Sequence, residues 1–90
     1  MSIPMKSSIN RRTLALIQSA QDLLPEDEFL RLMEYVEFDE HGLALEHLCD
    51  ILFELGLPCP SEMLGQIKQV GLAMKMEPSI WAKIEAGRDR

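Results

Sequence analysis

Residues Glu40 to Gly56, EHGLALEHLCDILFELG, decide the fold expected for this chain of 90 residues. With about 100° of turn per residue, an α-helix over this stretch separates two faces. The apolar face carries Ala44, Leu48, Ile51, Leu52 and Leu55, with Leu45 at its margin. Glu46 and Asp50 point away from that face, and Phe53 falls beside them. The pattern predicts a helix that packs its leucines into a core and presents an acidic surface bearing an aromatic ring.

The other segments predict further helices around this one. The first helix is expected to be capped by Ser7 or Ser8 and to end near Gln21, and the second to be entered at Pro25. Ser61 is expected to cap the fourth helix, and a short last helix is expected from Ser79 to near Gly87. Asp39 is the expected N-cap of the central helix, and Gly56 can end that helix in a left-handed conformation. Most of the prolines lie between the apolar-periodic segments, and runs of β-branched residues are absent. We therefore expect an all-α fold, a compact bundle of four to five short helices.

Length and composition favour a single helical domain over residues 1–90, in which residues 1–6 form a mobile tail. An apolar content of 47% is enough to build a core, which disordered chains lack. No apolar run approaches the roughly 20 residues of a membrane span, and no signal peptide is visible. The expected location is the cytoplasm, without membrane contact.

The net charge of −6 is distributed unevenly along the chain. Residues 1–21 carry three bases and no acid (+3), residues 22–62 carry twelve acids and one arginine (−11), and residues 63–90 carry five bases and three acids (+2). The central segment can be a merely solvated acidic surface, or a field that steers association with a basic partner. Direct binding to nucleic acid is disfavoured, because phosphate contacts need a patch of Lys and Arg.

The sequence contains no residue pattern that indicates a catalytic or a metal-binding site. His41 and His47 are six residues apart, a spacing that does not place both on one helical face, so solvated histidines are the favoured interpretation. Cys49 and Cys59 are expected to be free buried thiols, although a disulfide between them stays open. Paired carboxylates do acid–base work only in a cleft that raises one pKa, and an exposed helical row has no cleft. We expect no enzyme activity, no metal and no cofactor.

The aromatic residues fall into two groups. Trp81 is expected in the core. Separately, Gly71 lies on the apolar face of the helix that begins at Ser61 and would let another helix approach closely. Tyr35, Phe38 and Phe53 lie at the edges of apolar stripes near acids, where binding hot spots occur, although half-buried aromatics are also ordinary in small helical domains.

The acidic row of Glu46, Asp50 and Glu54 has a cost. Like charges four residues apart repel by a few tenths of a kcal/mol per pair, and no lysine follows at the neighbouring positions. This arrangement favours selection for a partner over selection for stability.

A central string reads Gly42-x-Ala44-Leu45-Glu46-x-Leu48-Cys49-Asp50-x-Leu52-x-Glu54; it follows Tyr35 and an acidic joint and precedes Pro58, Met63, Ile67 and Met74. With these residues, the chain from about Leu32 to Trp81 resembles the small helical immunity proteins of bacterial polymorphic toxin systems. The resemblance is in particular to the Maf-type immunity family, which neighbours the contact-dependent inhibition immunity proteins. The N-terminal helix adds nothing to it.

The resemblance implies a non-enzymatic protein that binds and neutralises a cognate toxin domain, often a nuclease. A nuclease presents cations to phosphate, so carboxylates on an inhibitor can cover that surface. The predicted interface comprises Tyr35, Phe38, Asp39, Glu40, Glu46, Asp50, Phe53 and Glu54. The alternative is a helical adaptor or regulator that binds a basic protein with no toxin involved. The chain is expected to be a monomer or a weak homodimer.

Overall fold

The computed structural model describes residues 5–88 of the chain and the side chains of residues 8–87. Its elements are α1 (Met5–Ser19), the 3₁₀ turn η1 (Gln21–Leu23), α2 (Glu26–Glu37), α3 (His41–Glu54), α4 (Ser61–Ala73) and α5 (Ser79–Arg88). No strand occurs in residues 5–88, and the expected all-α bundle is confirmed. α1 begins at Met5, inside the predicted tail and before the predicted serine caps. Residues 1–4 lie outside the described part, so the mobility of the tail stays a prediction.

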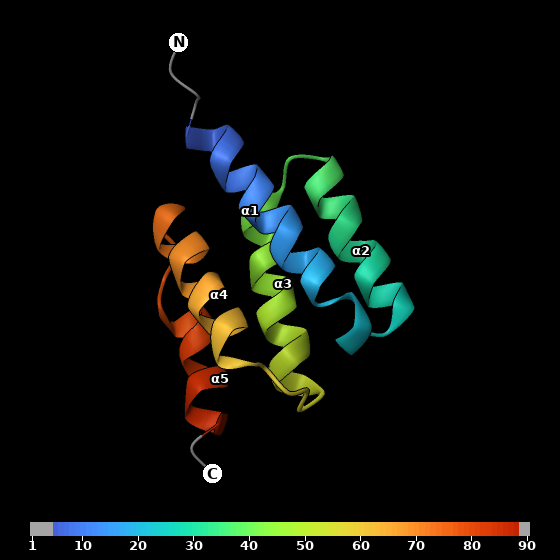
Figure 1. Ribbon diagram of the computed structural model, residues 1–90, viewed down its shortest axis with the longest axis vertical. Helices are drawn as coiled ribbons and strands as arrows, with labels where there is room; N and C mark the ends of the chain where they lie inside the picture. The colour runs from blue at the N-terminus through green and yellow to red at the C-terminus, as the bar shows by residue number, and fades with distance from the viewer. Residues whose placement is uncertain (1–4, 89–90) are drawn as a thin grey trace.

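α3 is the central helix of the bundle. It contacts each of the other four α-helices, and α1 also packs against α2 and α4. In Figure 1, α1 crosses in front of α3, with α2 on one side and α4 and α5 on the other. The stretch with the strongest leucine pattern is therefore the one around which the other helices pack. None of the described helices is both long enough and apolar enough to span a membrane.

The core is one continuous cluster built around α3. Ala44, Leu45 and Leu48 are fully enclosed, and Leu52 is 2% exposed, which confirms most of the predicted inner face. The prediction was wrong for Leu55, whose side chain is 53% exposed. Leu55 follows the last helical residue of α3, where the chain reverses direction. The helical period therefore no longer decides which way this side chain points.

The buried arc of α3 is wider than its leucine stripe, because helices pack on several sides of it. Cys49 is fully buried, as expected, whereas His41, predicted to be solvated, is only 7% exposed. Thr13 of α1 is also fully buried, and its hydroxyl donates a hydrogen bond of 2.8 Å to the carbonyl of Ile9. That bond satisfies the hydroxyl within its own helix, so a polar residue is tolerated in the core.

Three helices end in the same turn, a Schellman motif. After α3, Gly56 has a φ of 60°, and the N–H of Leu57 donates to the carbonyl of Leu52 at 3.0 Å. The left-handed glycine expected from the sequence is confirmed. The ends of α2 and α4 make the equivalent bonds but place non-glycine residues, Asp39 (φ 62°) and Lys75 (φ 58°), in the left-handed position.

The starts of α2, α3 and α4 differ by one residue from the predicted ones. Asp39 belongs to the end of α2, and Glu40 is the N-cap residue of α3, so the predicted cap at Asp39 was wrong. Pro60, not Ser61, is the N-cap residue of α4, and Pro25, the expected entry, is the N-cap residue of α2. A proline fits at a helix start because the first N–H groups have no partner within the helix.

α4 and α5 meet at a glycine. A Cβ atom added at Gly71 would lie 2.2 Å from Cζ3 of Trp81, far inside van der Waals contact. Trp81 is 4% exposed. The close approach expected at Gly71 and the core position expected for Trp81 are both confirmed.

Candidate partner-binding surface

The outer face of α3 presents part of the predicted interface to solvent. Glu46 and Glu54 are exposed, and Phe53 keeps 50% of its surface accessible. These residues lie opposite the buried leucines of the same helix, as the 100° spacing predicts. A half-exposed aromatic ring beside carboxylates is the kind of surface that contributes to protein interfaces.

Asp50, the centre of the predicted acidic row, is not simply solvated. Lys83 of α5 forms an ion pair with the Asp50 carboxylate, and the same ammonium group lies 5.4 Å from the centre of the Phe53 ring. Lys83 therefore neutralises Asp50 and makes a cation–π contact with Phe53. The sequence did not reveal this because the pairing depends on how α5 docks, 33 residues along the chain.

A second part of the predicted interface forms at the joint between α2 and α3. Tyr35, Phe38 and Glu40 line one surface hollow of about 460 Å³, together with Arg31 and Glu34. Phe38 is 68% exposed, the most exposed of the large apolar side chains in the described part. We name this feature the joint hollow. Arg31 and Glu34 were not predicted, although their helical spacing from Phe38 and Tyr35 would have pointed to them.

Tyr35, which lines the joint hollow, packs against His47 of α3. The rings of Tyr35 and His47 meet edge to face, with centroids 5.8 Å apart and planes at 77°. Nε2 of His47 lies 3.1 Å from a carboxylate oxygen of Glu28, and since a carboxylate only accepts, Nε2 donates. His47 was predicted to be solvated, and its side chain is only 26% exposed. It links α2 to α3 instead.

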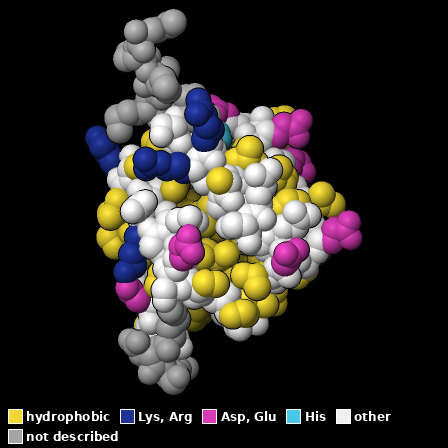
Figure 2. Space-filling view, viewed as in Figure 1, with side chains coloured by type: hydrophobic (Ala, Val, Ile, Leu, Met, Phe, Trp, Pro, Cys, Tyr) yellow, Lys and Arg dark blue, Asp and Glu magenta, His cyan; other side chains and the backbone are white. Residues whose placement is uncertain are grey.

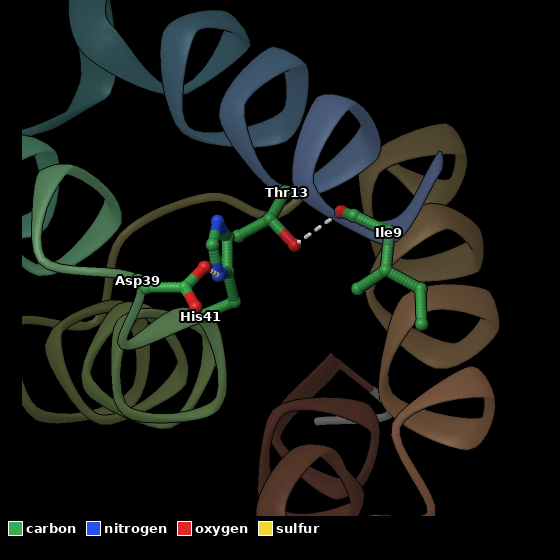
Figure 3. Close-up of polar contacts among 4 residues, drawn as sticks. All are labelled: Ile9, Thr13, Asp39 and His41. Carbon is green, nitrogen blue, oxygen red and sulfur yellow. Dashed lines mark hydrogen bonds and ion pairs between the residues drawn. The ribbon is translucent and has the colours of Figure 1, made fainter. Parts of the chain in front are cut away.

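The joint between α2 and α3 contains a contact between Asp39 and His41. Asp39 Oδ1 lies 3.4 Å from Nδ1 of His41, and Figure 3 shows the imidazole between Asp39 and Thr13 of α1. The Asp39 side chain is 52% exposed, so its carboxylate faces both solvent and His41. The predicted role of Asp39 in partner binding stays a prediction, but its carboxylate already has an intramolecular contact.

The cysteines are both free and buried, which is the state favoured from the sequence. Burial raises the pKa of the Cys49 thiol to about 12, against a partly opposing effect of Lys83. A thiol with so high a pKa stays protonated at neutral pH and is a poor nucleophile and metal ligand. No group of three His, Cys, Asp or Glu residues in the described part of the chain could hold a metal ion.

Charge is unevenly distributed over the face seen in Figure 2. Most of the acidic side chains visible there lie on the α2 side, whereas Lys and Arg lie over α1 and on the α4 side, where acidic side chains are also present. Both parts of the candidate surface belong to the acidic segment. Comparisons of the chain with family models, with curated proteins and with solved structures find no match.

Proposed function

We propose that this protein is a non-enzymatic inhibitor that binds a basic toxin domain, of the nuclease type that the immunity-protein resemblance implies. The observation that carries the proposal is the pair of exposed aromatic rings, Phe38 and Phe53, set among carboxylates on one acidic segment. Exposing a phenylalanine ring to water is unfavourable in free energy, and carboxylates that have no intramolecular cation repel one another. A complementary basic surface would relieve both costs.

The two kinds of group have different roles in this proposal. Exposed carboxylates such as Glu46 and Glu54 raise the association rate with a basic partner, and salt screens the effect. The aromatic rings bury area in the complex and slow its dissociation. Asp50 contributes less to steering than its place in the row suggests, because Lys83 already neutralises it.

The experiment is a kinetic measurement against the product of the adjacent upstream gene, with the double variant Glu46→Lys and Glu54→Lys. Both positions are exposed, so the fold is expected to survive. The association rate should fall about tenfold or more at low salt, and cells that express the toxin should lose protection. Asp50 is left unchanged, since its reversal would place two cations together at the contact with α5.

The matched control is the double variant Glu62→Lys and Glu77→Lys, which makes the same change of net charge at exposed positions outside α2 and α3. Equal effects of the two double variants would mean that only net charge matters, and the specific surface would be refuted. Binding to a basic protein that is harmless to cells would favour the adaptor alternative.

A further inference from the structure

Resting on the proposed function, we infer that the joint hollow is the socket for one arginine side chain of the protein partner. The hollow combines two aromatic side chains, Tyr35 and Phe38, with two carboxylates, Glu34 and Glu40. Its one cationic lining residue, Arg31, leaves an excess of one negative charge. An incoming cation is therefore the ligand that the lining charge complements.

Arginine suits this lining better than lysine does. A guanidinium group is planar, so it stacks on an aromatic ring while its edge donates to a carboxylate. It is also more weakly hydrated than an ammonium group, which lowers the cost of leaving water. The volume of about 460 Å³ leaves room for a long side chain.

The backbone of the hollow and its Tyr35 ring are also preorganised. The Schellman turn holds its backbone, since the N–H of Glu40 donates to the carbonyl of Tyr35 at 2.8 Å. The ring of Tyr35 packs edge to face against His47, and His47 donates a hydrogen bond to Glu28. A binding site whose walls are already fixed loses less conformational entropy when the ligand enters.

The socket is distinct from the outer face of α3. On that face, Phe53 already has a cation over its ring, the ammonium group of Lys83. No such cation–π contact is made with Phe38, which is 68% exposed, within the described residues. The ring that is open to a cation from a partner is thus Phe38, at the joint. The contact between Lys83 and Phe53 is an example, within this protein, of the contact that we assign to the partner's arginine.

The test is a titration of the ¹⁵N-labelled full chain with N-acetylarginine amide, followed by chemical shifts. The neutral probe is N-acetylcitrulline amide, which has nearly the same shape without the charge. We expect arginine to cause saturable shifts at residues 34–40 and at the ring protons of Tyr35 and Phe38. Citrulline should cause none of comparable size.

Variants locate the binding. Phe38→Ala should weaken arginine binding about threefold to tenfold, because it removes an exposed ring that the core does not need. The control is Leu72→Ala, which removes another exposed apolar side chain (60%) on α4, outside the candidate surface, and should leave arginine binding unchanged. Equal shifts with citrulline, shifts spread over every acidic helix, or full binding by Phe38→Ala would each overturn the inference.

The outcome is separable from that of the proposed function. If the upstream gene product binds the parent and Phe38→Ala with equal affinity, the socket is refuted and the inhibitor proposal survives. If the arginine probe binds at the joint but no toxin binds, the socket survives and the proposed toxin is refuted.

Discussion

Gly71 shows how strongly a single residue can limit the fold. Ala at this position would place its Cβ 2.2 Å from the indole of Trp81, and the tryptophan is too enclosed to move aside freely. We expect Gly71→Ala to lower the free energy of unfolding by about 1–3 kcal/mol, the usual cost of overpacking a core. Urea unfolding followed by Trp81 fluorescence measures it.

The control lies on the same helix. A Cβ at Gly65 would have no neighbour within 4 Å, so Gly65→Ala gains helix propensity without a clash. It should raise the free energy of unfolding by about 0.5–1 kcal/mol. Opposite signs for the two substitutions are the expected result. A stabilising Gly71→Ala would mean that α5 does not pack as described.

Two helices of this protein are followed by a non-glycine residue in the left-handed region, which is a strained backbone conformation. Lys75 ends α4 in the left-handed region, with φ 58°, which costs an L-residue about 1–2 kcal/mol. Glycine avoids that cost but has more freedom to lose on folding. We therefore expect Lys75→Gly to stabilise the protein by about 0.5–1 kcal/mol, measured as a higher urea midpoint.

Lys75→Ala separates conformation from charge. It removes the same ammonium group but keeps a side chain in the left-handed region, so no gain of stability is expected. Gly56→Ala applies the argument in reverse after α3 and should cost about 1 kcal/mol. If alanine stabilises at position 75 as much as glycine does, the effect is electrostatic and the backbone argument is wrong.

The whole molecule depends on one core. Leu48 is fully buried in the helix that contacts all the others, so Leu48→Ala should cost about 2–5 kcal/mol. A domain of this length has a total stability of roughly 5–13 kcal/mol, so the loss is a large fraction. Circular dichroism in urea should show a lower midpoint and still a single transition, because no helix has a core of its own.

Leu43→Ala is the control for this prediction. Leu43 lies on the same helix but is 49% exposed, so its truncation should cost less than about 1 kcal/mol. Similar losses at the two positions would contradict the assignment of the inner face of α3.

Much of the fold followed from local chemistry in the sequence. Leucines at helical spacing identified α3 and its buried face, and prolines and Gly56 marked where helices stop. The acidic character of α2 and α3 and the exposure of Phe38 and Phe53 could also be predicted, because both depend on the angular position of a residue on its own helix.

Contacts between distant segments were decided only by tertiary packing. Asp50 is paired because α5 brings Lys83 to it, and His41 and Cys49 are buried because several helices surround α3. The joint hollow likewise needs the turn after α2, in which the left-handed Asp39 lets Glu40 fold back beside the side chains of α2. A helical period tells which way a side chain points from its own axis, but not which other element, if any, lies there.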